Sequence, residues 1–386
     1  MSNEDSESCP STEKQLVLAA LLKDELLALG LSDARVDEHG YVYASLAANT
    51  EGASSIGFIA HMDTSPDASD ENIKTQLVKY EGGDILLNEE KGIYLKCEDY
   101  PYLADYEGHT LITSDGTTLI GADDKAGIAE IMTMLEKIIS SSAPHGKICI
   151  GFTPDEEIGR GADLFDVEGF GADFAYTVDG GPIGELEYEN FNAATAKVTV
   201  NGVSIHPGSA KGKMKNASRI AFEFNALLPE DEIPEKTSGY EGFHHLISMS
   251  GKCEEASLVY IIRDHDMKKF SAKKECFKSV AEKINALYGE GTVELELTDS
   301  YYNMREKIEP FMFVVERAKS AMQKLGITPV ITPIRGGTDG ARLSYMGLPC
   351  PNLSTGGENF HSRFEFVSVE AMEKISDILV EIAKAN

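Results

Sequence analysis

Basic side chains are scarce in this sequence, with 35 Lys and Arg against 64 Asp and Glu among 386 residues. The formal net charge of −29 repels phosphate backbones, and no cluster of Lys and Arg provides the positive surface that nucleic-acid binding requires. We therefore expect no nucleic-acid partner. The acidity points only weakly to bound cations, because solubility alone would explain it.

Long apolar runs and paired cysteines are also missing. No stretch approaches the roughly 20 apolar residues that cross a bilayer, and the first eight residues are acidic and polar rather than basic and then apolar. The six cysteines are scattered, in a chain too large to need disulfide bonds. The sequence therefore predicts neither membrane insertion nor secretion, and a cytoplasmic location fits best.

What the sequence contains is the pattern of a folded globular protein with two domains. Its 386 residues exceed the usual domain size of about 100 to 200 residues, and a hydrophobic content of 42% is ordinary for a globular protein. Near the start, Thr12 and Gln15 resemble a capping box, followed by an amphipathic helix with Leu16, Ala20 and Leu27, ending near residue 30.

In the first part, short apolar runs alternate with a helical stripe, as in sheets covered by helices on both faces. The predicted strands are 41–46, 56–60, 147–152 and 174–178. The stripe consists of Ile128, Ile131, Leu135, Ile138 and Ile139.

From about residue 193 the predicted order becomes βαββαβ. Its elements are strand 193–203, helix 214–228, strands 245–252 and 257–263, helix 267–287 and strand 292–298, with a surface loop at 229–242. After residue 303 the sequence again predicts alternating helices and strands, as in the first part. They are a helix at 310–325, a strand near 330–334 and a final helix from residue 369. We predict an α/β catalytic domain with a mixed central sheet flanked by helices, formed by residues 1–191 and 303–386. A smaller α+β domain at 192–302 interrupts it.

His61 and Asp63 form the first candidate pair, directly after the predicted strand 56–60. Residues two apart in an extended chain point the same way, so Asp63 can accept one ring proton of His61 and leave the other nitrogen for a metal. A polar pair after a strand is more often a simple turn. The pair therefore makes His61 a candidate ligand, with Asp63 as the residue that orients it.

Acidic side chains recur at other boundaries between elements. Asp123 opens a predicted helix, where capping alone would explain it, although its two oxygens could also bind two cations. Glu156 and Glu157 follow the strand 147–152, where ligands of α/β sheets usually bind. Clustered acids repel one another, which a cation or a proton would relieve, and adjacent glutamates could divide metal binding from proton transfer.

Two further candidates complete a set. Asp179 ends the apolar run 174–178 before two glycines, and His361 is unremarkable by itself. Together with His61, Asp123 and Glu157 they come from separate segments, four of them directly following predicted strands. Mixed His and carboxylate ligands suit zinc, or manganese or cobalt, and five ligands with one bridging carboxylate suit two ions.

At these residues the sequence resembles the peptidase T family, tripeptide aminopeptidases within the wider group of co-catalytic zinc peptidases that includes carboxypeptidase G and aminoacylase. The likeness runs nearly end to end. It rests on the segments that begin at His61, Gly121, Thr153 and Tyr176, and on His206-Pro207-Gly208, Tyr301–Glu306, Arg335–Gly340 and the His361 segment. Members of this family usually open with an extra amphipathic helix, so we expect different packing near Met1.

The resemblance implies how the site works. One metal would be held by His61 and Asp179 and the other by Glu157 and His361, with Asp123 bridging and Glu156 as general acid and base. Asp63 would assist catalysis, and the Asp123–Asp124 peptide bond would be cis. The smaller domain would act as a lid or dimerisation domain in a possible homodimer.

Substrate recognition would fall to the smaller domain and its neighbours. The resemblance implies that His206 stabilises the oxyanion and that Asn303 and Arg335 bind substrate. Arg263, at the end of the strand 257–263, could clamp a C-terminal carboxylate through paired hydrogen bonds. An ion pair with Asp264 or Asp266 is its alternative.

The expected reaction is release of the N-terminal residue from short peptides. The metal ligands do not encode which end of the substrate is bound, so a dipeptidase, carboxypeptidase or N-acyl amino acid hydrolase remains an alternative. A metal-stabilised binding protein without turnover is another, but Glu156, beside a ligand and not needed as one, argues against it.

Overall fold

The computed structural model describes residues 1–385, which fold as two compact units. The first unit comprises Met1–Tyr188, Met304–Thr332 and the chain from Thr338 onward, and the second comprises Glu189–Asn303 and Pro333–Gly337. The assignment of Pro333–Gly337 to the second unit was not predicted from the sequence. This segment joins the second unit because the amide of Ile334 donates to the carbonyl of Glu189.

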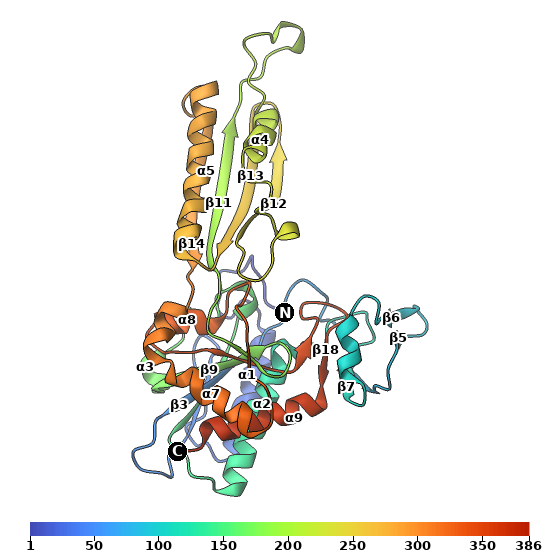
Figure 1. The fold of residues 1–386 in the computed structure, drawn as a ribbon, viewed down its shortest axis with the longest axis vertical. Coiled ribbons are helices and arrows are strands. Elements are labelled where there is room, and N and C mark those ends of the chain that lie inside the picture. Colours follow the sequence, from blue (N-terminus) through green and yellow to red (C-terminus); the bar gives the residue numbers. More distant parts are fainter. Residues whose placement is uncertain (386) are drawn as a thin grey trace. The chain divides into compact units, whose positions relative to one another are not determined.

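An eight-stranded mixed sheet, to which β3 and β9 in Figure 1 belong, forms the centre of the first unit. Its strand order is β1-β2-β8-β3-β9-β16-β10-β15. The neighbours β8, β3, β9 and β16 are parallel to one another, whereas β2 is antiparallel to β8 and β10 is antiparallel to β16. The edge strand β1 pairs antiparallel with β2. These strands are β1 Arg35–Val36, β2 Val42–Leu46, β3 Ile56–His61, β8 Ile148–Thr153, β9 Phe174–Gly180, β10 Glu185–Glu187, β15 Val330–Ile331 and β16 Asn352–Ser354.

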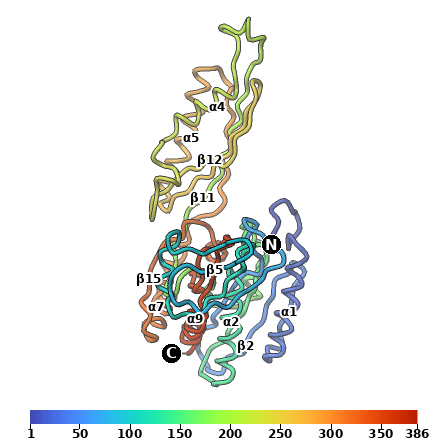
Figure 2. Tube along the Cα trace, turned by 90° about the vertical axis from the view of Figure 1, so that its right-hand side faces the viewer, coloured from blue at the N-terminus to red at the C-terminus, as the bar shows by residue number. Residues whose placement is uncertain are grey.

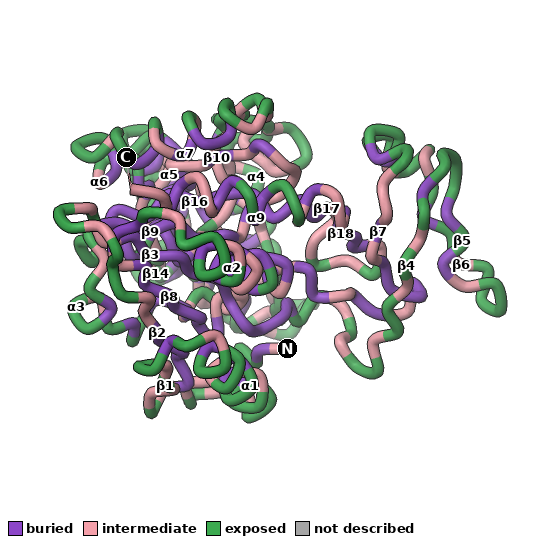
Figure 3. Tube along the Cα trace, turned by 90° about the horizontal axis from the view of Figure 1, so that it is seen from below, coloured by how far each residue is buried: buried purple, intermediate pink, exposed green. Residues whose placement is uncertain are grey.

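Helices cover both faces of this sheet, which confirms the predicted α/β class. On one face α2 packs against β3 and β9, and α9 packs against α2 and α7. On the other face α3 and α8 enclose an apolar cluster with Tyr43, Phe165 and Phe170. The helices are α1 Lys14–Ala28, α2 Ala122–Ser141, α3 Val167–Phe170, α6 Arg305–Ile308, α7 Phe313–Lys324, α8 Asp339–Tyr345 and α9 Val369–Ala383. Figure 3 shows β3, β8 and β9 as the buried centre, as expected for strands covered on both faces.

The first helix buries a different face from the one predicted. Gln15, Ala19, Leu22 and Leu26 are its buried residues, while Leu16 and Leu27 are about 40% exposed. The segment is apolar on both sides, so periodicity alone could not choose between them. The predicted capping box is also wrong, because the N-cap position, Glu13, makes no capping side-chain hydrogen bond. Figure 2 shows α1 beside β2.

Short strands missing from the sequence prediction form a second, antiparallel sheet, β17-β18-β7-β4, and a β5–β6 hairpin. They are β4 Gln76–Lys79, β5 Ile85–Asn88, β6 Ile93–Leu95, β7 Thr110–Thr113, β17 Gly357–Glu358 and β18 Phe366–Ser368. Strands of two to four residues are too short for a clear alternation of apolar residues. The connection between β17 and β18 carries His361.

The second unit has the predicted βαββαβ order and an antiparallel sheet, β12-β13-β11-β14. Its elements are β11 Asn192–Asn201, α4 Ala217–Ala226, β12 Phe243–Gly251, β13 Glu255–Asp264, α5 Met267–Tyr288 and β14 Val293–Tyr301. Phe224, Tyr260, Phe270 and Phe277 are fully buried between the helices and the sheet. Each such side chain contributes about 1.5 to 3 kcal/mol, so this unit has its own core.

Short 3-10 segments complete the chain: η1 Pro101–Tyr106, η2 Glu156–Ile158, η3 Pro207–Ser209, η4 Pro234–Lys236 and η5 Glu309–Phe311. Among residues 1–385, no helix has both the length and the apolar character that crossing a bilayer requires.

Candidate dinuclear metal centre

Three of the candidate ligands meet at one edge of the central sheet because their strands are parallel neighbours. His61 is the last residue of β3, Asp179 lies near the end of β9, and Glu157 follows β8 in the turn η2. The carboxyl ends of adjacent parallel strands share one edge. The strand order β8-β3-β9 therefore brings these side chains together.

The other two candidate ligands reach the same edge by different routes. Asp123 lies at the start of α2, and His361 lies between β17 and β18 with a positive φ of 62°. The expectation that four of the five ligands directly follow strands is therefore wrong. Asp123 comes ten residues after β7 ends at Thr113, and His61 and Asp179 are themselves strand residues.

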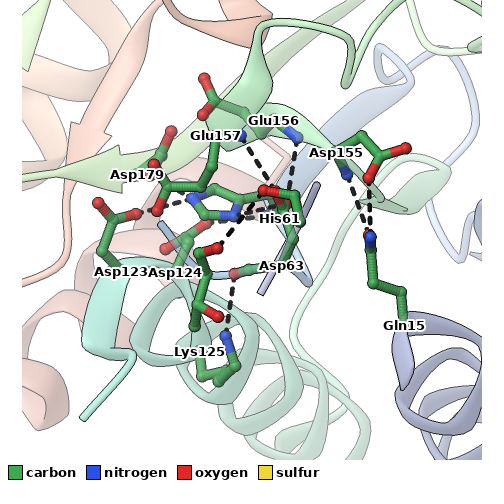
Figure 4. A network of polar contacts seen from close by, with 12 residues as sticks. Gln15, His61, Asp63, Asp123, Asp124, Lys125, Asp155, Glu156, Glu157 and Asp179 are labelled. Carbon is green, nitrogen blue, oxygen red and sulfur yellow. Dashed lines mark hydrogen bonds and ion pairs between the residues drawn. The ribbon is translucent and has the colours of Figure 1, made fainter. Parts of the chain in front are cut away.

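Asp123 occupies the centre of the group, with one oxygen toward each histidine. Its Oδ1 lies 2.7 Å from Nε2 of His61, and its Oδ2 lies 3.2 Å from Nε2 of His361. Asp179 completes the first group, with its Oδ1 3.4 Å from His61 Nε2. Glu157 completes the second, with its Oε2 2.8 Å from His361 Nε2. Figure 4 shows His61 surrounded by these carboxylates.

Electrostatics in this cluster favour positive charge. Burial opposes a charge on His61, but Asp179, Asp123 and Asp63 outweigh it and raise the pKa of the ring well above its usual value. The hydrogen bonds of His361 to Asp123 and Glu157 raise its pKa to about 11. Burial raises the pKa of Asp179 to about 7. Closely packed carboxylates thus demand neighbouring positive charge, supplied by protons or by metal ions.

The donor set fits two metal ions. His61, Asp123 and Asp179 offer ligand atoms within 4.8 Å of one another, and so do Asp123, Glu157 and His361. In addition, Oε1 of Glu157 is buried and has no hydrogen-bond partner among residues 1–385, which is costly for a carboxylate unless a cation binds it. Carboxylate oxygens and imidazole nitrogens together suit divalent transition metals.

Asp63 lies behind His61 as predicted and also holds the neighbouring loop. Its Oδ1 is 3.2 Å from Nδ1 of His61, and its two oxygens accept hydrogen bonds from the amides of Glu156 and Glu157, each at 3.1 Å. Asp63 is fully buried, and although burial opposes its ionisation, His61 keeps its pKa below the usual value. One carboxylate therefore orients a histidine and fixes the turn that carries Glu157.

The adjacent aspartates at the start of α2 have different tasks. Asp124 accepts hydrogen bonds from the amides of Gly127 at 3.2 Å and His61 at 3.1 Å, so it is the one that caps the helix. Asp123 faces the histidines instead. The peptide bond between them is cis, as the resemblance implies.

Glu156 stays outside both ligand groups, although it is adjacent to Glu157 in sequence. Burial, with a further contribution from Asp179, raises its pKa well above the usual value. The turn η2 therefore separates two neighbouring glutamates, with Glu157 beside His361 and Glu156 free of any histidine contact within the described chain.

The predicted substrate-binding residues all belong to the second unit. His206 is exposed, and its Nδ1 accepts a hydrogen bond from the amide of Gly208. Arg263 donates to the carbonyls of Ala194 and Ile262 and lies over the ring of Tyr301, 5.4 Å from its centre.

The alternative partners proposed for Arg263 are wrong. Asp264 lies 3.7 Å from the ammonium of Lys273, and Asp266 caps α5 by accepting from the amides of Lys268 and Lys269. The acidic side chains next to Arg263 in sequence therefore contact other groups and not its guanidinium.

Asn303 and Arg335 are both held tightly within the second unit. Asn303 is buried, and its side chain donates to the carbonyl of His265 and accepts from the amide of Asn190. Arg335 donates to the carbonyls of Gly239 and Glu241 and stacks on two phenylalanines, Phe191 and Phe243.

Sequence reasoning missed several supporting acids. Glu365 accepts hydrogen bonds from the amides of Ile120, Gly121 and Asp123 and so fixes the start of α2. Asp67 lies 3.3 Å from Nδ1 of His361. The only sequence signal for a role of Asp67 at the site was its position six residues after His61. Glu365 alternates with apolar residues, as is ordinary in a strand, and this pattern does not indicate a site.

Comparisons with known proteins place the chain among peptidases. Residues 188–292 match the family model described as a peptidase dimerisation domain. Peptidase T of Clostridium novyi is 57% identical over 384 residues, which cover 99% of this chain and 94% of that protein. The crystal structure of aminopeptidase PepT from Bacillus cereus aligns with a TM-score of 0.79 and 26% identity over 98% of this chain and 94% of that one. A dinuclear metal-binding peptidase from Bacillus subtilis shares the fold, with a TM-score of 0.66 and 16% identity over 98% and 93% of the two chains.

Proposed function

The chain belongs to the peptidase T family and is a peptidase, and we propose that it releases the N-terminal residue from tripeptides with the help of two metal ions. The observation that carries this proposal is the shared carboxylate of Asp123, which has one oxygen toward each of two separate ligand groups. Zinc suits this donor set best, and manganese or cobalt would also fit it.

Each residue of the site has a distinct task. His61 and Asp179 would hold one ion, Glu157 and His361 the other, and Asp123 both. When bound, such ions polarise a carbonyl and lower the pKa of water. Asp63 keeps His61 in the orientation that directs its Nε2 toward the ligand group, because the opposite ring nitrogen faces Asp63.

Glu156 performs the proton transfers in this proposal. Its carboxylate takes a proton from the attacking water and then delivers that proton to the nitrogen of the departing amine. A positioned acid and base of this kind contributes about 10²- to 10⁴-fold to the rate. Its position outside the ligand groups leaves its carboxylate available for this task.

The test is an assay of protein from which metal has been chelated and then restored one ion at a time. Di-, tri- and tetrapeptides and N-acylated amino acids are compared as substrates. We expect the fastest release of an N-terminal residue from tripeptides. Preference for N-acylated amino acids would make the chain a deacylase, and lack of turnover with every ion would leave a metal-binding protein.

The second unit supports assembly and substrate recognition. Its match to a peptidase dimerisation domain favours a homodimer. Arg263 and His206 are proposed to bind the substrate's far end and the developing oxyanion, with Asn303 and Arg335 as further substrate contacts. Because two guanidinium contacts of Arg263 are to backbone carbonyls, its orientation is fixed before any substrate arrives.

We expect Arg263→Ala to impair cleavage of free tripeptides at least about tenfold more than cleavage of their C-terminal amides. A guanidinium pairs strongly with a carboxylate but not with a neutral amide. The measurement is kcat/KM for matched peptide acids and amides, with Arg219→Ala, on α4 of the same unit, as the control. Equal losses on both substrates would show that Arg263 is purely structural.

A further inference from the structure

The turn that carries Glu156 and Glu157 is fixed from two opposite sides. On one side, both of their amides donate to Asp63, as described above. On the other side, the preceding residue, Asp155, is completely buried and accepts hydrogen bonds from a distant segment of the chain. Figure 4 shows Asp155 paired with Gln15 beside the metal-ligand cluster.

The side-chain contacts of Asp155 come from the start of α1 and the residues just before it. Its carboxylate accepts from the amide of Ser11 at 2.7 Å, from the hydroxyl of Ser11, and from the side-chain amide of Gln15 at 2.7 Å. In return, the amide nitrogen of Asp155 donates to Oε1 of Gln15 at 3.1 Å. Gln15 therefore holds both the side chain and the backbone of Asp155.

This double contact holds an unusual backbone conformation. Asp155 has φ 58° and ψ 26°, in the left-handed region that residues other than glycine seldom occupy. A rotation at this residue would re-aim Glu156, which follows it directly. The Gln15 amide restrains rotation about the φ bond of Asp155, because it binds the amide nitrogen on one side of that bond and the side-chain carboxylate on the other.

Gln15 is itself held rigidly. It is only 3% exposed and lies on the buried face of α1 with Ala19, Leu22 and Leu26. A polar side chain on the buried face of a helix is costly unless its hydrogen bonds are satisfied. Packing of this helix face would be satisfied by an apolar side chain at position 15. The amide of Gln15 is therefore explained by its hydrogen bonds with Asp155.

We propose that Gln15 is a positioning residue for catalysis, which acts through Asp155 to aim the carboxylate of Glu156. This inference rests on the acid and base role proposed above for Glu156. It assigns a catalytic consequence to the first turn of α1, more than 140 residues away in sequence. Misplacement of a catalytic group by about 1 Å can cost roughly 10²-fold in rate, so a small shift of this turn would be measurable.

The first test is Gln15→Leu, which keeps the volume but removes both hydrogen bonds with Asp155, together with those to the hydroxyls of Ser11 and Thr12. We expect kcat on a tripeptide to fall about tenfold or more, with little change in KM and with the metal content of the wild-type protein. Leu26→Ala is the control, since it destabilises the same helix without touching Asp155. We expect this control to lower the Tm but to keep kcat.

A double-mutant cycle with Glu156→Gln separates positioning from general damage. If Gln15 acts through Glu156, Gln15→Leu lowers kcat in the wild type but lowers it no further in the Glu156→Gln background. An equal loss in both backgrounds would overturn the inference. An unchanged kcat in Gln15→Leu would overturn it too, while leaving the proposed function intact. A wild-type protein that cleaves no peptide would overturn both.

Gln15→Glu provides a second variant that preserves size if the leucine variant folds poorly. At neutral pH the added carboxylate repels Asp155, so kcat falls relative to the wild type. As the pH decreases, the introduced acid gains a proton and can again donate to Asp155. We expect the ratio of variant to wild-type kcat to rise as pH falls, and a ratio independent of pH would contradict the proposal.

Discussion

Replacement of Glu156 by Gln is expected to lower kcat by about 10² to 10⁴ while two metal ions stay bound. The amide keeps the shape of the side chain but cannot carry the proton from the water to the leaving amine. Since Glu156 contacts neither His61 nor His361, its loss removes no ligand. Tripeptide kinetics and metal analysis of the same preparation measure both quantities.

Glu157→Gln is the matched control for this experiment. The Oε2 of Glu157 lies 2.8 Å from His361 Nε2, and its other oxygen is buried without a partner. We expect this variant to lose metal as well as activity. Metal loss in the Glu156 variant, with full occupancy in the Glu157 variant, would show that the two roles are exchanged.

Replacement of Asp123 by Asn is expected to remove at least about 10³-fold of kcat/KM, because the Lewis acidity of the ions contributes several kcal/mol. The oxygens of Asp123 face the two histidines separately, at 2.7 and 3.2 Å. An amide has one oxygen and no charge, so it cannot serve both ligand groups. We therefore expect the metal content to fall below two ions per chain.

Asp124→Asn, at the neighbouring position, is the control for the bridging role. Asp124 accepts from the amides of Gly127 and His61 and belongs to neither ligand group. Its replacement should weaken the start of α2 but keep both ions and most of the activity. If the Asp124 variant lost metal as readily as the Asp123 variant, the assignment of separate tasks to these two residues would be contradicted.

The predictable part of the site follows from the parallel strands. Apolar runs end directly before His61, before the acids near Glu157, and before Asp179. Parallel strands place such ends at one edge of a sheet. His61, Glu157 and Asp179 could therefore be proposed from residue types and strand ends together. Asp123 was ambiguous in the sequence, because two adjacent acids at a helix start look equivalent until one of them is seen to cap the helix.

Elements with little periodicity could not be predicted. The strands β17 and β18, which hold the connection containing His361, have two and three residues, and short strands of this kind leave no pattern to count. The ion pair with Asp264 or Asp266, the alternative for Arg263, was also wrong. Adjacent acids in sequence were the obvious candidates, but α5 capping and Lys273 engage them instead.

The sequence by itself determined the α/β class, the βαββαβ order of the inserted segment and the five candidate ligands, because apolar periodicity and residue chemistry are local properties. The tertiary structure decided which oxygen of Asp123 faces which histidine, which face of α1 is buried, and that Gln15 holds Asp155. These depend on contacts between residues far apart in the chain. Such contacts are selected by the packing of whole elements, which no local pattern encodes.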